Sequence, residues 1–215
     1  MSIPTTYAEL KTEIANWLNR SDLTDDIETF IKFGEVSINR VSRLSQQETT
    51  TAVVTTSGQN YTSLPTGFIE GISLTFDDDL YSDPEKIDIS ELDKNSIQTS
   101  SGTPQYYAIS DEKYYWNQKP DAAYNLTARY YKKWDIATDT TNWLLTNNPD
   151  IYLYASLSQA GKFIKHPDRS EWMGEAERIL SELEYQSIKQ KKAPLTVDAA
   201  LMSASGTNSN IFQGF

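Results

Sequence analysis

The sequence predicts an α+β fold, in which both ends of the chain form one helical bundle, an antiparallel β module is inserted between them, and an extended C-terminal arm follows. Three observations support this prediction. Apolar residues recur at helical spacing near both ends, they alternate in short runs between these segments, and the last residues are too polar to build a core. We expect boundaries at 1–47 for the N-terminal helix pair, 48–137 for the β module, 138–192 for the C-terminal helix pair and 193–215 for the arm.

The first helix begins after Thr6, which can form a capping box with Glu9. A second start signal follows at Thr24, where acidic residues favour the positive end of the helix dipole. The apolar stripe of the first helix consists of Tyr7, Leu10, Ile14, Trp17 and Leu18, and that of the second consists of Ile27, Ile31, Gly34, Ile38 and Val41.

Short β-rich runs occupy the middle of the chain, at 51–55, 68–76, 105–110, 113–117 and 124–131. The last run alternates: Tyr124, Leu126, Ala128 and Tyr130 share one face, and Asn125, Thr127, Arg129 and Tyr131 share the other. The residues Ser110, Asp111 and Glu112 predict a hairpin turn between two of these runs. These runs predict a small antiparallel sheet or barrel.

Helical spacing returns after Asn148, where Pro149 takes the first helical position, and ends before Pro167. Asp168 and Glu171 can open a last helix. Its apolar stripe is Trp172, Ala176, Ile179, Leu180 and Leu183. Two helices on each side of the β segment favour one bundle made from both ends of the chain.

The composition excludes several classes of protein. The 215 residues include 30 acidic and 19 basic side chains, no cysteine and one histidine, for a net charge of −11. Disulfides, thiolate nucleophiles and cysteine- or multi-histidine metal sites are therefore excluded, and a basic DNA-wrapping protein is disfavoured. No nucleophile elbow, phosphate loop or dinucleotide motif is present, so we expect no enzyme and no cofactor.

Membrane association is not expected either. No apolar run approaches the roughly 18 residues that a membrane span requires, and the first residues lack the order of a signal peptide. We expect a soluble protein that stays in the cytoplasm where it is synthesised.

Much of the acidity lies in the middle of the chain. Residues 46–135 hold 14 acidic and 7 basic side chains, so −7 of the −11 falls there. The densest part is an acidic surface made by Asp77, Asp78, Asp79, Asp83 and Glu85. It lacks the alternation and the glycine of a calcium loop, so a solvated acidic loop is favoured over a metal site.

The sequence His166-Pro167-Asp168 lies between two predicted helices and resembles the loop of J-domain co-chaperones. The alternative is a proline-terminated helix that meets a helix capped by Asp168. The helix before the motif is not strongly basic, as that of a J-domain is, which favours the second interpretation. A soluble regulator or enzyme with a bundle core also stays open.

Several segments, in order, resemble the head-to-tail adaptor, or connector, proteins of tailed bacteriophages. They are YAEL at 7–10, WLNRSDLTDD at 17–26, residues 30–40, LPTGF at 64–68, GTPQYY at 102–107, KPD at 119–121, TNWLLT at 141–146 and NPDIYLY at 148–154. The resemblance covers most of residues 5–185 and is weakest beyond residue 193.

This resemblance implies a structural protein of the virion neck. Members assemble as rings, commonly dodecamers, beneath the portal protein, with a tail or nozzle protein on the opposite face and double-stranded DNA passing through the channel. Their C-terminal arms reach the portal. On this basis we expect portal contacts from the apolar residues of the arm, Leu201, Met202, Ile211, Phe212 and Phe215, and a DNA-repelling channel lining from part of the acidic surface.

Overall fold

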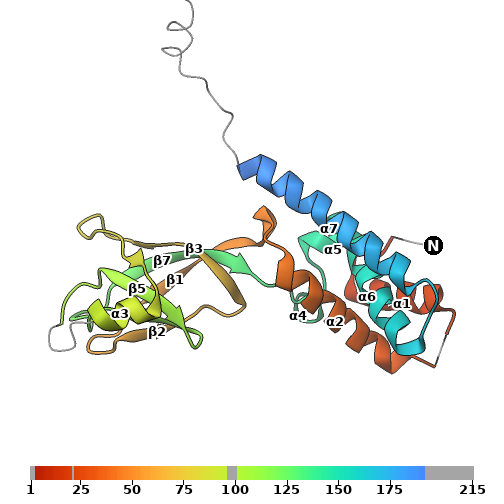
Figure 1. The fold of residues 1–215 in the computed structure, drawn as a ribbon, viewed down its shortest axis with the longest axis horizontal. Coiled ribbons are helices and arrows are strands. Elements are labelled where there is room, and N and C mark those ends of the chain that lie inside the picture. The colour runs from red at the N-terminus through yellow and green to blue at the C-terminus, as the bar shows by residue number, and fades with distance from the viewer. Residues whose placement is uncertain (1–2, 21, 96–100, 192–215) are drawn as a thin grey trace, which may run out of the picture.

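The computed structural model describes residues 3–20, 22–95 and 101–191. Most helices gather at one end of an elongated molecule, and the strands lie at the other end together with helix α3, Ile89–Asn95 (Figure 1). The predicted C-terminal arm, 193–215, lies outside the described residues.

The helical bundle joins the two ends of the chain, as predicted. It contains α1 (Tyr7–Leu18), α2 (Thr24–Val41), the short α5 (Trp143–Asn147), α6 (Pro149–Ile164) and α7 (Arg169–Lys191). Helix α6 is central, because the side chains between residues 151 and 161 are almost all buried under its neighbours. One apolar cluster includes residues from all five helices.

The helix ends follow the local sequence in most places. Thr6 and Glu9 form the predicted capping box of α1. Pro149 stands in the first turn of α6, and Lys165 ends that helix in the left-handed conformation. Helix α2 begins at Thr24 as expected, but its N-cap is Leu23, which supplies no side-chain cap.

Most residues of the predicted stripes are buried or partly buried. Val41 is an exception, because its side chain is 58% exposed at the end of α2. Gly34 on the same helix allows α2 and α6 to approach closely, since a Cβ at this position would lie 3.0 Å from the backbone nitrogen of Ser156.

The first sheet of the β module has the order β1-β7-β3, with all pairs antiparallel. Its strands are β1 (Glu48–Val54), β3 (Phe68–Phe76) and β7 (Asn125–Lys132), which correspond to three of the predicted runs. The alternation in β7 is confirmed, because Leu126, Ala128 and Tyr130 are buried together with Tyr124, which directly precedes the strand.

The second sheet has the order β2-β6-β5-β4, made by β2 (Tyr61–Ser63), β4 (Glu85–Lys86), β5 (Tyr106–Ser110) and β6 (Lys113–Trp116). The antiparallel prediction is wrong for one pair, since β4 runs parallel to β5. The long connection between β4 and β5, which includes α3, allows these two neighbouring strands to run in the same direction. The predicted β5–β6 turn is confirmed, with positive φ at Asp111 and Glu112.

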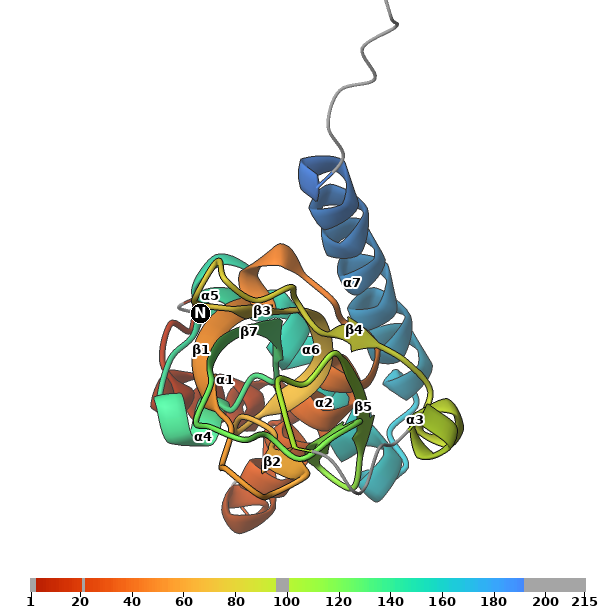
Figure 2. The same ribbon diagram turned by 90° about the vertical axis from the view of Figure 1, so that its left-hand side faces the viewer.

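A second, aromatic-rich core lies inside the β module. Tyr107, Tyr114 and Trp116 from the second sheet pack in it with Leu126 and Ala128 from the first. Viewed along the long axis, the strands of the two sheets lie around a common interior (Figure 2). The 3₁₀ turn η1 (Ser45–Gln47) and helix α4 (Ile136–Asp139) lie where the β module meets the bundle.

Candidate interaction surfaces

The predicted acidic surface begins at the end of β3 that is remote from the bundle. Three of its carboxylates shape the loop: Asp77 accepts a hydrogen bond from the hydroxyl of Thr127 at 2.7 Å, Asp78 accepts one from the N–H of Leu80, and Asp83 accepts one from the N–H of Phe76. Asp79 and Glu85 are exposed, and neither side chain has a hydrogen-bond or ion-pair partner among the described residues. All five residues are exposed, four of them in the loop between β3 and β4 and Glu85 at the start of β4.

This segment shows no arrangement suited to a metal ion. Within residues 3–20, 22–95 and 101–191, no three acidic or histidine side chains converge as a ligand set would. The most exposed large apolar side chain of this segment is Leu80, at 84%.

A wide depression of about 890 Å³ lies between β4, α3 and β5. Its carboxylates come from Glu85, Asp88 and Glu91, but Asp88 is already used by the fold. The hydroxyl and N–H of Ser90 donate to Asp88 and hold the pKa of that carboxyl below its usual value of 3.8. Asn117, also at the depression, accepts hydrogen bonds from the N–H groups of Gln105 and Tyr106. The side chains of Asp88 and Asn117 therefore stabilise the β module itself.

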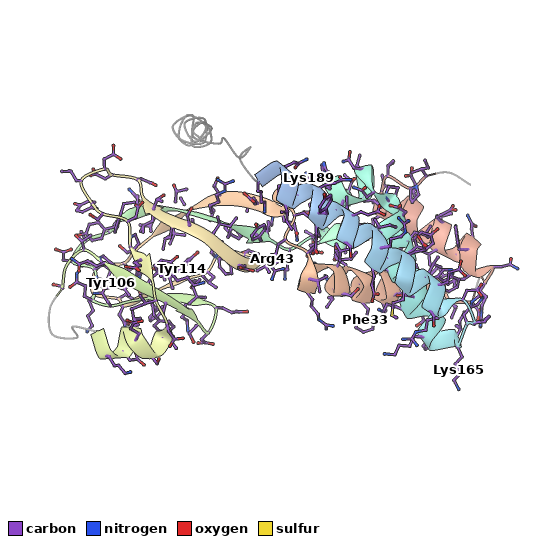
Figure 3. The ribbon with its side chains drawn as sticks, turned by 45° about the horizontal axis from the view of Figure 1, so that its top comes forward. Phe33, Arg43, Tyr106, Tyr114, Lys165 and Lys189 are labelled. Carbon is purple, nitrogen blue, oxygen red and sulfur yellow. The ribbon has the colours of Figure 1, made fainter. Side chains whose placement is uncertain are left out.

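The end of α7 is attached to the place where the bundle meets the β module. Lys191 lies 2.8 Å from a carboxylate oxygen of Glu48 at the start of β1, and it also contacts the hydroxyl of Tyr131. The side chain of Ser187 accepts a hydrogen bond from the N–H of Ser45 at 2.8 Å. Figure 3 shows Lys189 of α7 near this junction, where Arg43 also lies.

Glu48 is the centre of this attachment. Burial alone would raise its pKa, but the hydrogen bonds from Lys191 and Arg129 outweigh burial and leave the pKa below its usual value of 4.5. The pair joins residues 143 positions apart, so no local pattern in the sequence indicates it. The attachment fixes the point from which the chain continues into the predicted arm.

His166 has a structural role in the turn between α6 and α7. Its ring stacks on Trp172 with 4.6 Å between ring centroids, and its Nδ1 accepts a hydrogen bond from the N–H of Asp168. These contacts fit the interpretation of the motif as a helix-to-helix turn.

A buried carboxylate in the bundle was not among the predicted residues. Glu35 of α2 is almost fully buried, accepts a hydrogen bond from the N–H of Ile136 at 2.7 Å, and accepts another from the hydroxyl of Tyr152 at 3.1 Å. Desolvation by this burial raises the pKa of Glu35 above 4.5, although the two hydrogen bonds act in the opposite direction. The signal in the sequence is an acidic residue inside an apolar stripe, one turn after Ile31.

Among the described residues, no helix is both long enough and apolar enough to cross a membrane.

Comparison with known proteins places the fold in a family. A comparison with curated protein sequences gave no match. A family model described as SU10 adaptor protein matches residues 5–198, which include the helices of the bundle, the β module and the turn at His166. Because this match covers most of the 215 residues, the chain belongs to the SU10 adaptor protein family, a family of phage head-to-tail adaptors.

Proposed function

We propose that this chain assembles into a ring in the neck of the virion, where it joins the portal protein to the tail or nozzle protein. The family match over residues 5–198 is the observation that carries the proposal. We propose a dodecamer, which would have a mass of about 290 kDa for chains of 24.4 kDa. Double-stranded DNA passes through its channel without sequence-specific contacts, and the role needs no catalytic step.

Imaging of the virion neck tests this proposal. We expect density for the bundle and the β module between the portal and the tail. A virus that lacks the chain is expected to produce DNA-filled heads separate from tails. Normal tailed particles from such a virus, or the location of the chain outside the neck, would contradict the proposal.

The arm after Lys191 is proposed as the anchor on the portal. Its apolar residues are Leu201, Met202, Ile211, Phe212 and Phe215, which stand among small polar residues. The attachment of Lys191 to Glu48 supports this role, because it sets a fixed starting point for the arm and so limits the region that the arm can reach.

Removal of the residues after Pro194 is expected to abolish binding to isolated portal rings. Alanine substitutions at Ser203, Ser205 and Ser209 provide a matched control, because they keep every apolar residue of the arm. Unchanged affinity of the truncated chain would show that the arm is not the anchor.

Part of the acidic surface is proposed to line the channel, where carboxylates repel phosphates. Asp79 and Glu85 are the residues to change, because neither shapes the loop. Asp79→Lys with Glu85→Lys is expected to slow DNA exit, and Asp79→Asn with Glu85→Gln to have a smaller effect. A basic lumen in the assembled ring would overturn this part of the proposal.

A further inference from the structure

A groove lies on the bundle between α2 and α7, with α6 as its floor. Its volume is about 380 Å³. Two apolar side chains at its edge, Val41 of α2 and Met173 of α7, are 58% and 43% exposed. This surface therefore combines a concave shape with apolar side chains that no described residue covers.

The groove is also basic, although the chain has a net charge of −11. Arg40, Lys162 and Arg169 line it, and Glu177 is the acidic residue of its lining. Throughout the described residues, none of the three cations has an ion-pair partner. Unpaired cations around an apolar groove favour an acidic partner with an apolar anchor.

The opposite side of the bundle has the complementary character. Trp143 of α5 is 36% exposed there, and Glu9 of α1, Asp139 of α4 and Asp150 in the first turn of α6 are exposed on the helices of this side. None of these three carboxylates is paired with a cation in the described part of the chain. Tryptophan is the side chain most typical of an anchor at the centre of an interface.

Two hydrogen bonds hold this second face together. The N–H of Tyr7 donates to the carbonyl of Thr140 at 2.8 Å, and the hydroxyl of Thr141 donates to the carbonyl of Thr5 at 2.8 Å. They join the start of α1 to the connection between α4 and α5. In the view along the long axis, α1, α4 and α5 lie on one side of the molecule and α7 lies on the other (Figure 2).

We infer that the groove of one copy receives the Trp143 face of a second copy, with Trp143 against Val41 and Met173 and the unpaired carboxylates facing the unpaired cations. The partner is a second copy because each chain carries both complementary faces. Since the two faces differ and lie on opposite sides of the long axis, the contact is head-to-tail, which closes into a ring when the rotation fits. This inference rests on the proposed adaptor function and assigns its subunit contact.

Charge reversal of each face tests the inference in the full chain. The groove variant carries Arg40→Glu and Arg169→Glu, and the opposite variant carries Asp139→Lys and Asp150→Lys. Each is expected to raise the concentration for half-maximal assembly at least about tenfold in analytical ultracentrifugation. Trp143→Ala is expected to do the same without a change in charge, so the test does not depend on one variant that fails to fold.

Restoration provides the sharper readout. A chain with all four reversals, or an equal mixture of the two variants, pairs acidic grooves with basic faces and is expected to assemble again. Lys189→Glu is the matched control, because Lys189 lies on α7 but does not line the groove, and it is expected to leave assembly unchanged. Circular dichroism and thermal unfolding check that each variant is folded.

The outcomes separate this inference from the adaptor function. Assembly that survives the reversals, or a four-reversal chain that stays monomeric, overturns the assigned contact, whereas a ring in the neck would still support the function. A wild-type chain that stays monomeric at the highest concentration measured in the ultracentrifuge also overturns the assigned contact. The adaptor function would still hold in that case if the ring assembled only on the portal.

Discussion

Tyr152 donates its hydroxyl hydrogen to Glu35 at 3.1 Å inside the bundle, and Asn142 donates to the same hydroxyl at 2.8 Å. These two hydrogen bonds link α2, α6 and the start of α5. Glu35 also accepts a hydrogen bond from the N–H of Ile136, which connects α4 to the same group. Glu35 therefore connects the bundle core to the segment that returns from the β module.

Glu35→Ala is expected to destabilise the protein by about 2–4 kcal/mol, because it leaves the N–H of Ile136 and the hydroxyl of Tyr152 buried without their acceptor. Chemical unfolding followed by circular dichroism measures this loss. Glu35→Gln keeps an acceptor and is expected to lose much less. Equal losses for the two variants would contradict the role of the hydrogen bonds.

The contribution of Glu35 to the stability of the protein is expected to depend on pH. Because burial raises the pKa of Glu35 above 4.5, its contribution to stability is fully present below pH 4.5 and is lost as the pH rises through the raised pKa. Glu35→Gln removes this dependence. We expect the stability of wild type relative to Glu35→Gln to increase as the pH falls from 7 toward 4.5, measured by urea unfolding at each pH.

Gly34 and Gly174 form a matched pair for the packing of the bundle. A Cβ at residue 34 would lie 3.0 Å from the nitrogen of Ser156 and 3.1 Å from the carbonyl carbon of Ala155, and these backbone atoms would have to shift by a few tenths of an ångström. At residue 174, on the exposed side of α7, a Cβ meets no atom within 4 Å.

Gly34→Ala is therefore expected to destabilise the protein by about 1–3 kcal/mol, whereas Gly174→Ala is expected to stabilise it by about 0.5–1 kcal/mol through helix propensity. Thermal unfolding of both variants measures the difference. Stabilisation by Gly34→Ala would show that α2 and α6 do not approach as closely as described.

The elements that could be predicted from the sequence are those whose pattern is local. The stripe of α1 and the alternation of β7 repeat over enough residues to show their period. In contrast, β2 has three residues and β4 has two, so their conformation depends on pairing with distant strands. The direction of β4 was therefore not available from the local pattern.

The interaction surfaces, too, could be predicted only where their residues are close together in the sequence. The acidic surface was predicted because five carboxylates are close in sequence. The groove and the Trp143 face were not predicted. The cations of the groove, for example, are Arg40, Lys162 and Arg169, which come from three helices that only the folded bundle brings together. The attachment of Lys191 to Glu48 was missed for the same reason.

This attachment is expected to fail at low pH. Since its partners lower the pKa of Glu48, the contribution of Glu48 to stability is present above pH 4.5 and is lost as the pH falls through the lowered pKa. The last two turns of α7 are then expected to fray, which would be seen in the amide chemical shifts of residues 185–191. Glu48→Gln should show this fraying already at pH 7 and with little pH dependence.

Glu70→Gln is the control for this experiment, because the Arg43–Glu70 ion pair lies near the same junction. The side chain of Glu70 is 56% exposed, whereas that of Glu48 is 13% exposed. Exposed pairs contribute little, so this variant should leave α7 unchanged. Fraying of α7 in Glu70→Gln, or none in Glu48→Gln, would contradict the proposed attachment.

The turn between β5 and β6 offers a route to a more stable β module. Asp111 and Glu112 have φ of 47° and 55°. A two-residue hairpin turn of type I′ requires positive φ at both central residues, and glycine adopts positive φ most easily. Glu112→Gly removes this strain and keeps the ion pair between Asp111 and Lys113. We expect stabilisation by about 0.5–1 kcal/mol in thermal unfolding. Glu112→Val, which is β-branched, should instead destabilise the hairpin, and a Gly variant less stable than wild type would show that the turn does not have this conformation.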